Sequence, residues 1–442
     1  MFRDQYRGLV RSQWLGDQQE WLFWNGKRWQ RSALSRVREL AKDIARLVLV
    51  DIENAIAGKD EKDRSAENKA RLSWTRRLRN DPFKMTKIAE SDPALCIEAE
   101  TLDADKHLFN CQSGVIDLKA GLLLPHSPDY LITMISPVEF DESAQCPKWL
   151  KMLDQIFEGD TDLISFIQKV LGKALRGDGS DHFFPIWYGS GANGKSVVQD
   201  ILLHIAGDYG AAVRSESLMV KRSDQIPNEV MQLKGKRIVF APEGAEARLM
   251  DSALVKQISA GDPISGRFLH KEFQTFKPQC VLTLITNHLP KMNGADNALL
   301  RRLAVIPFAF VVPANERDPH LKEKLMGEAS GILNWLIQGA LTNGPIERPK
   351  AVLIANGTYA KEHDQVAQFI EERCVSEQGA RESSSSLYSA FRVWQMSVVN
   401  TFTSSNTISS KQAFGRSMVL KLGASKKDSY GNMYFMDIRL RT

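Results

Sequence analysis

The sequence has few cysteines and no pair of them spaced as C-x-x-C. The five cysteines stand at positions 96, 111, 146, 280 and 374 of 442 residues, widely separated and odd in number. This arrangement supports neither a zinc ribbon nor a disulfide framework. We therefore expect a reduced, cytoplasmic protein.

The chain also lacks a long apolar run and a marked excess of one charge. No apolar stretch approaches the roughly 18–20 residues that cross a bilayer, and the amino-terminal MFRDQYR lacks the apolar core of a signal peptide. We expect no membrane partner. The net charge of +5 is too small to indicate nucleic-acid binding by itself. At roughly 100–200 residues per domain, 442 residues allow two to four domains.

What the chain does have is one glycine-rich segment, GSGANGKS, at 189–196, between an apolar run at 183–188 and a helical pattern. It matches G-x-x-x-x-G-K-[ST], whose glycines turn backbone N–H groups toward a phosphate at a helix amino terminus. Lys195 would then reach the β- and γ-phosphates, and the Ser196 hydroxyl would bind Mg²⁺. The alternative is a chance glycine turn. We predict a nucleoside-triphosphate site formed by Gly189, Ser190, Gly191, Ala192, Asn193, Gly194, Lys195 and Ser196.

Two strands downstream of this loop end in polar residues. The first, at 237–241, precedes PEGAE, where we expect Glu243 to hold Mg²⁺ and Glu246 to help polarise the attacking water. The second, at 280–286, ends at Asn287, whose amide is predicted to position that water. The alternatives are an ordinary acidic loop and a helix-capping asparagine.

Basic residues lie near two further elements of the central region. Arg301 and Arg302 precede a strand at 303–308 and would reach a neighbour's γ-phosphate as an arginine finger in a ring of copies; we favour Arg302. Residues 264–276 alternate as a β-hairpin with a charged tip. Such a hairpin would grip a phosphate backbone in a ring's pore, unless it is an ordinary surface hairpin. Its candidate DNA-binding residues are Arg267, His270 and Lys271.

Outside the central region, basic residues gather in two places. Residues 59–87 hold ten lysines and arginines against five acids. They indicate either a solvated helix face or, with Trp74, a phosphate-contacting surface. Residues 411–442 hold seven lysines and arginines against two acids, in a predicted helix followed by predicted strands at 425–429 and 433–440. This pattern favours a winged-helix module that binds DNA or docks a protein.

The order of the central motifs resembles that of superfamily 3 helicases, in the branch of poxvirus and satellite-phage primase–helicases. The segments that carry the resemblance are GSGANGKS, KRIVFAPEGAE, LVKQISAGDPISGR, TLITNHLP and RRLAVIPF, with NCQSGVIDLKAGLLLPH in the amino-terminal domain. The resemblance implies a ring-forming AAA+-type ATPase, usually a homo-hexamer, that uses ATP and Mg²⁺. Such enzymes translocate on single-stranded DNA and unwind forked duplex.

The family's site residues carry over onto the phosphate loop, Glu243, Glu246, Asn287 and Arg302, and its pore hairpin onto 264–276. The acidic motif departs from the family, which often has a serine before the first acid, so the roles of the two glutamates stay open. Only residues 1–145 precede the ATPase and no primase active site is visible, so we expect no priming activity. A separate primase or host replication proteins are the expected partners.

We therefore predict an α/β P-loop ATPase with helices on both faces of an AAA+-like sheet, flanked by smaller domains. The predicted parts are an α+β domain at 1–145, the ATPase at 146–345, a helix and linker at 346–386, and a winged-helix-like domain at 387–442. The predicted function is a replicative DNA helicase of a phage, plasmid or mobile element. The alternative is an ATP-regulated origin-binding initiator or helicase loader that does not unwind DNA. A small-molecule P-loop kinase is disfavoured, because such enzymes lack a hairpin followed by a strand–Asn motif.

Overall fold

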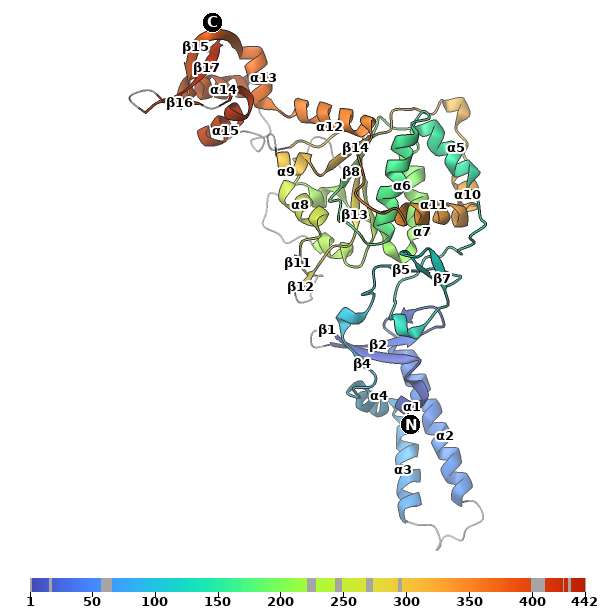
Figure 1. Cartoon of the computed structure of the whole chain (residues 1–442). Coiled ribbons are helices and arrows are strands. Elements are labelled where there is room, and N and C mark those ends of the chain that lie inside the picture. The colour runs from blue at the N-terminus through green and yellow to red at the C-terminus, as the bar shows by residue number, and fades with distance from the viewer. Residues whose placement is uncertain are drawn as a thin grey trace. The chain divides into compact units, whose positions relative to one another are not determined.

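The computed structural model describes residues 2–15, 18–56, 66–220, 228–242, 249–267, 273–292, 296–398, 410–423, 425–427 and 431–441. The chain divides into two units (Figure 1). The first comprises residues 1–144 and 204–209, and the second comprises residues 145–203 and 210–442. Among the described residues, no helix is long and apolar enough to cross a membrane.

The first unit contains two small sheets and a helical hairpin. One sheet has the strand order β3-β2-β1-β4, and the other is an antiparallel meander in the order β5-β6-β7. The strands are β1 (Val10–Leu15), β2 (Gln18–Trp24), β3 (Trp29–Gln30), β4 (Cys96–Ile97), β5 (Leu108–Asn110), β6 (Val115–Asp117) and β7 (Leu122–Leu124). The helices are α1 (Phe2–Tyr6), α2 (Leu34–Ile56), α3 (Ala66–Asn80) and α4 (Pro82–Glu90). In Figure 1, α2 and α3 lie side by side.

The core of the first unit forms where α2 packs on the first sheet. Val37, Ala41 and Ile44 recur at helical spacing and are buried against Val10 of β1 and Trp21 of β2. Exposed positions of α2 include the charged Arg36, Glu39 and Arg46, as in an amphipathic helix, although Leu47 and Val50 are also exposed.

The second unit is built on a five-stranded, all-parallel sheet in the order β14-β8-β13-β10-β9. Its strands are β8 (Phe184–Tyr188), β9 (Gly210–Ala212), β10 (Ile238–Pro242), β13 (Val281–Thr286) and β14 (Leu303–Pro307). Four of them coincide with the strands expected from the sequence, which confirms the α/β class. The helices that surround the sheet are α5 (Pro147–Ile156), α6 (Thr161–Leu175), α7 (Lys195–Ala206), α8 (Ser252–Ala260), α9 (Asn297–Leu300), α10 (Leu321–Met326) and α11 (Ala329–Ala340).

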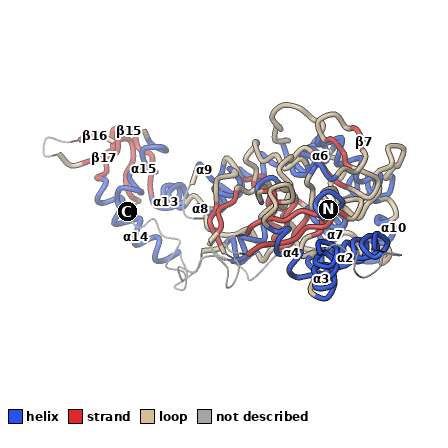
Figure 2. Tube along the Cα trace, turned by 90° about the horizontal axis from the view of Figure 1, so that it is seen from below, coloured by secondary structure: helices blue, strands red, loops and turns tan. Residues whose placement is uncertain are grey.

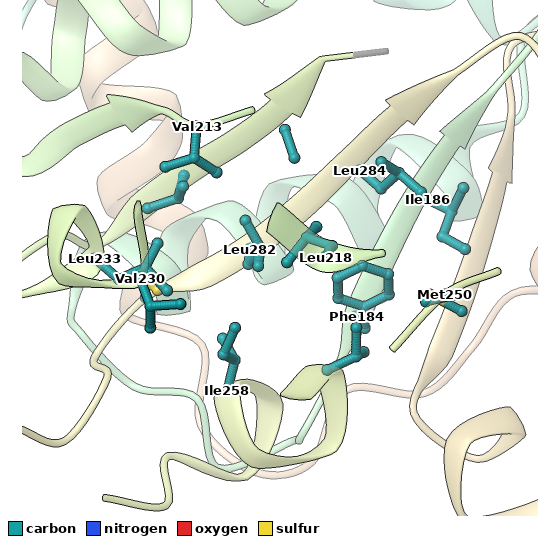
Figure 3. Close-up of a cluster of buried hydrophobic side chains, with 14 of the residues drawn as sticks. Phe184, Ile186, Val213, Leu218, Val230, Leu233, Met250, Ile258, Leu282 and Leu284 are labelled. Atoms are coloured by element: carbon teal, nitrogen blue, oxygen red, sulfur yellow. The ribbon is translucent and has the colours of Figure 1, made fainter. Parts of the chain in front are cut away.

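Alternate residues of these strands face opposite sides of the sheet. Phe184 and Ile186 of β8 lie with Leu282 and Leu284 of β13 in one buried cluster, which also includes Ile258 of α8 (Figure 3). The alternate residues of β8 and β10 face the other side of the sheet. They include the buried rings of Trp187 and Phe240, whose centroids are 5.1 Å apart. The sheet is apolar on both faces, as expected for buried parallel strands.

Helices α6 and α11 pack together at glycines (Figure 1). A Cβ at Gly172 of α6 would stand 2.2 Å from the backbone nitrogen of Ala340. A Cβ at Gly339 of α11 would stand 2.2 Å from the carbonyl oxygen of Gln168. Only glycine permits this approach of two helix backbones.

The last part of the second unit has the order helix, strand, two helices, two strands. Its elements are α13 (Gln365–Arg373), β15 (Cys374–Ser383), α14 (Ser384–Val398), α15 (Lys411–Leu422), β16 (Lys426–Lys427) and β17 (Met433–Leu440). The strands form an antiparallel sheet in the order β15-β17-β16, and the three helices gather beside it (Figures 1 and 2). Rings of Phe369, Phe391 and Phe414, one from each helix, form the centre of their core.

The linker predicted within 346–386 falls on the polar residues 377–386, and the structure contradicts it. These polar residues continue β15 and begin α14, and β15 pairs with β17 across a register shift between Ser376 and Arg381. Gly379 at the shift has φ +83° and donates its backbone N–H to the Asp437 carboxylate at 2.7 Å. A mostly exposed, irregular strand is polar enough to resemble a linker in sequence.

The boundary expected at residue 387 is also too late. Phe369 of α13 and Cys374 of β15 belong to the same buried cluster as Phe391 of α14. The preceding helix, α12 (Lys350–Glu362), packs instead on the central sheet. Its Asn356 side chain accepts a hydrogen bond from Val305 N–H and donates one to the Leu303 carbonyl, both in edge strand β14. The last module therefore begins near α13.

Candidate functional site

The predicted phosphate loop connects β8 to α7, and its backbone takes conformations that favour glycine. Gly191 and Gly194 have φ of +101° and +82°, and Ala192 between them has φ of +52°. A Cβ at Gly189 would stand 2.4 Å from the Phe308 carbonyl oxygen. The glycines of the motif are thus required by local geometry.

Lys195, the first residue of α7, is buried beneath this loop with 6% of its surface exposed. Its Nζ donates hydrogen bonds to the Gly189 carbonyl at 2.7 Å, to Asn193 Oδ1 at 2.9 Å and to Asn287 Oδ1 at 3.2 Å. The charge is therefore held by three oxygens, which offsets the cost of burying an ammonium group.

Asn193 braces the loop from within. Its Nδ2 donates to the Phe308 carbonyl at 3.0 Å while its Oδ1 accepts from Lys195. The preceding residue, Ala192, also holds the loop in place, because its carbonyl accepts a hydrogen bond from the Val312 N–H at 2.9 Å. Sequence reasoning placed Asn193 in the loop but missed this bracing role, since the motif leaves that position unspecified.

The ends of neighbouring parallel strands bring the predicted motifs to one edge of the sheet. Thr286 of β13 pairs with Tyr188 of β8, so Asn287 and the phosphate loop follow adjacent residues. Pro242, the last residue of β10, pairs with Ile285. Glu243 and Glu246 follow Pro242 and lie outside the described residues.

Arg301 and Arg302 lie at the amino-terminal ends of the strands, opposite the ends that carry the phosphate loop. They precede β14, and the Arg302 carbonyl accepts from Phe184 N–H at the start of β8. Along a strand rise of about 3.3 Å per residue, the five residues of β8 separate them from the phosphate loop of the same chain. Arg301 is exposed, whereas Arg302 is partly buried and its Nη1 donates to the Ala298 carbonyl at 2.8 Å.

The predicted hairpin is present in its described part. β11 (Ile264–Gly266) pairs antiparallel with β12 (Gln274–Phe276), with Ile264 opposite Phe276. Arg267 is exposed, and its guanidinium lies 5.1 Å from the ring centroid of Phe273. His270 and Lys271 lie outside the described residues.

These residues fit a nucleoside triphosphate by the chemistry of their donors. The loop combines a buried ammonium, the exposed hydroxyls of Ser190 and Ser196, and the amino terminus of α7. The described residues contain no cluster of histidine, cysteine and acidic side chains that would hold a metal ion unaided. Any Mg²⁺ here would share its coordination with the nucleotide, as is usual for this ion.

Comparisons with known proteins bear on the chain's family and fold. Residues 1–158 match the family model described as "D5 N terminal like". A "Putative helicase" of Acanthamoeba polyphaga mimivirus is 29% identical over 353 residues, covering 73% of this chain and 36% of that protein. A "Putative helicase" of Frog virus 3 is 22% identical, covering 73% of this chain and 43% of that protein.

A "Putative primase" of African swine fever virus is 22% identical, covering 73% of this chain and 37% of that protein. The chain thus spans less than half the length of these three viral relatives. Among solved structures, the A form apo structure of the NrS-1 C terminal region shares the fold at 12% identity. Its TM-score is 0.51, with 99% of this chain and 98% of that chain covered.

The match of the amino-terminal region and the viral relatives support the same assignment as the order of motifs. These comparisons support placing the chain with a D5-type branch of the superfamily 3 helicases.

Proposed function

We propose that the chain is an ATP-dependent DNA helicase that acts in replication of a phage, plasmid or other mobile element. The observation that carries this proposal is the contact of Lys195 with Asn287, which joins the phosphate loop to the tip of the adjacent strand. A lysine and an asparagine so placed lie where they would contact a γ-phosphate and the water that attacks it.

In this proposal the chain's own residues bind and orient the reactants. Bound ATP with Mg²⁺ would supply the phosphoanhydride whose hydrolysis drives movement along DNA. Lys195 would exchange its carbonyl and amide partners for phosphate oxygens, and the Ser196 hydroxyl would hold the metal ion. Asn287 would orient the attacking water, with Glu243 and Glu246 following the neighbouring strand β10 as metal ligand and base.

The position of the arginine pair supports assembly into a ring, with six copies as the expected number. Arg301 and Arg302 stand a full strand length from their own phosphate loop. An arginine finger would therefore come from a neighbouring copy, where it stabilises negative charge during hydrolysis. The greater exposure of Arg301 favours Arg301 over Arg302, the residue preferred from sequence. The hairpin with Arg267, His270 and Lys271 would contact single-stranded DNA in the pore.

The carboxyl-terminal module supports a second DNA contact or a docking role. Its order of elements, with α15 followed by the β16–β17 pair, fits the proposed winged helix. A module of this kind also supports the alternative, an ATP-regulated initiator or loader that leaves unwinding to another protein. A separate primase and host replication proteins are the proposed partners.

The decisive experiment measures ATPase activity and unwinding of a forked duplex by the purified chain, with and without Mg²⁺. We expect single-stranded DNA to stimulate ATP hydrolysis, and Lys195→Ala and Glu243→Gln to abolish hydrolysis and unwinding together. Lys322→Ala, which removes an exposed lysine paired with Asp200 on α7, is the matched control and should keep both activities. Unwinding by the Lys195→Ala variant would refute the proposal. Hydrolysis by the native chain without unwinding would favour the initiator or loader.

A further inference from the structure

Helix α3 presents an unusual row of side chains in the first unit. Arg71, Trp74 and Arg77 are spaced three residues apart, so they lie along one face of the helix. All three are exposed, and the Trp74 side chain is 56% exposed. An indole ring so exposed forgoes much of the free energy that burial would supply, and here it stands between two arginines on one face of a helix.

The surroundings of this row are strongly basic. Residues 66–90 carry seven lysines and arginines against three acids, and five of the seven belong to α3. Acids pair with some of these cations: Arg76 lies 3.9 Å from Glu53 of α2, Lys84 lies 3.7 Å from Asp81, and Lys87 lies 3.0 Å from the largely buried Glu90. The segment still carries more cationic than anionic side chains. The face of α3 is therefore positive on both sides of an aromatic ring.

We propose that this row is a binding surface for single-stranded nucleic acid, in which a base stacks on Trp74 and flanking phosphates contact Arg71 and Arg77. Consecutive members of the row are offset by about 4.5 Å along the helix axis, so the two guanidinium groups emerge on either side of the indole. An aromatic platform with cations beside it is the arrangement by which proteins hold single strands without reading sequence.

The chemistry of the row favours nucleic acid over a protein partner. Tryptophan and arginine are also enriched in protein–protein interfaces, but lysine is depleted there. The excess of lysines and arginines over acids in residues 66–90 matches the negative charge of a phosphate backbone. The surface belongs to a different unit from the phosphate loop and does not require nucleotide turnover. It is thus additional to the DNA contact proposed for the hairpin, and its failure would leave the helicase proposal intact.

The test measures binding of the full chain to a fluorescent oligothymidylate by anisotropy, without nucleotide, over a range of salt concentrations. We expect Trp74→Ala to weaken binding about 5- to 100-fold, the loss of one stacked base, with an unchanged salt slope. Arg71→Gln and Arg77→Gln should each reduce the slope of log K against log[salt] by about 0.7, one phosphate contact on a single strand. Trp74→Phe should restore most of the affinity, because it keeps a stacking ring.

Two matched controls lie in the same unit. Trp14 on β1 is 52% exposed, and Arg46 on α2 is exposed and paired with Asp43, so Trp14→Ala and Arg46→Gln should leave affinity and slope unchanged. Ultraviolet cross-linking to the same oligonucleotide should label a tryptic peptide that contains Trp74. The proposal is overturned if Trp74→Ala binds as the native chain does and no such peptide is labelled. A change in self-association alone, with DNA binding intact, would also overturn it and would identify the row as a protein-docking surface.

Discussion

Lys195 Nζ lies 3.2 Å from Asn287 Oδ1, although 92 positions separate the two residues in the chain. They meet because β8 and β13 are parallel neighbours whose carboxyl ends lie in register, with Tyr188 opposite Thr286. The same edge of the sheet receives the end of β10 through the pairing of Pro242 with Ile285. In an open parallel sheet, the carboxyl ends of adjacent strands are where ligands bind.

The contact of Lys195 with Asn287 yields a kinetic prediction. Asn287→Ala should lower kcat for ATP hydrolysis by about 100-fold or more, with a small change in KM, because the amide is proposed to orient water rather than to bind ATP. Gln338→Ala, which truncates an exposed amide on α11, should leave both constants unchanged. Steady-state hydrolysis assays test this, and an increase in KM with an unaltered kcat would contradict the assigned role.

The close packing of α6 on α11 predicts a sharp difference between two glycines. Gly172→Ala should reduce the free energy of unfolding by about 1–3 kcal/mol, because its Cβ would stand 2.2 Å from the backbone of Ala340. Gly357→Ala on α12 has no atom within 4 Å of its Cβ and should stabilise the protein by up to about 1 kcal/mol through helix propensity. Thermal and denaturant unfolding measure both, and equal effects of the two substitutions would show that the helix contact is loose.

The partly buried ion pair of Arg176 with Asp178 predicts part of the protein's sensitivity to acid. Burial alone would raise the pKa of Asp178, but hydrogen bonds from Arg176 at 2.7 Å and from Ser180 lower that pKa to about 2. The carboxylate therefore stabilises the fold by about 2 kcal/mol above pH ~4, and this contribution disappears as the pH falls from ~4 to ~2.

The measurement for Asp178 compares free energies of unfolding across this range of pH. Asp178→Asn should be less stable than the native chain at pH 7, and the difference should shrink toward pH 2. Asp162→Asn, at an exposed position of α6, is the control and should show little difference at either pH. A constant deficit for Asp178→Asn at all pH values would argue against the ion pair as its cause.

The cysteines should differ widely in reactivity toward alkylating reagents. Burial raises the pKa of Cys280 to about 12, and burial with nearby acids raises that of Cys146 and Cys374 to about 11. Burial also raises the pKa of Cys111. The thiolate is the reactive form, so iodoacetamide at pH 7.5 should label the partly exposed Cys96 first. Mass spectrometry of the folded protein measures this, and rapid labelling of Cys280 would mean that the core of the sheet opens readily.

Local sequence patterns predicted much of the second unit because their determinants are local. The glycine loop is set by φ angles that favour glycine at residues 191 and 194, and the strands by short apolar runs between turns. The hairpin at 264–276 follows from alternating residues on both sides of its tip, and the described strands confirm it. The irregular strand β15 escaped prediction because its pairing with β17 depends on residues about 60 positions away.

Local patterns of residues were enough to predict the glycine loop at 189–196, four strands of the parallel sheet and the resemblance to a helicase family, since each depends on neighbouring residues in a fixed order. The tertiary structure brings Lys195 into contact with Asn287 and Asn193 into contact with Phe308. It also places the arginine pair at the amino-terminal ends of the strands, away from the loop. Those relationships depend on the order of strands in the sheet. That order is set by packing between segments distant in the chain, which no local pattern of residues encodes.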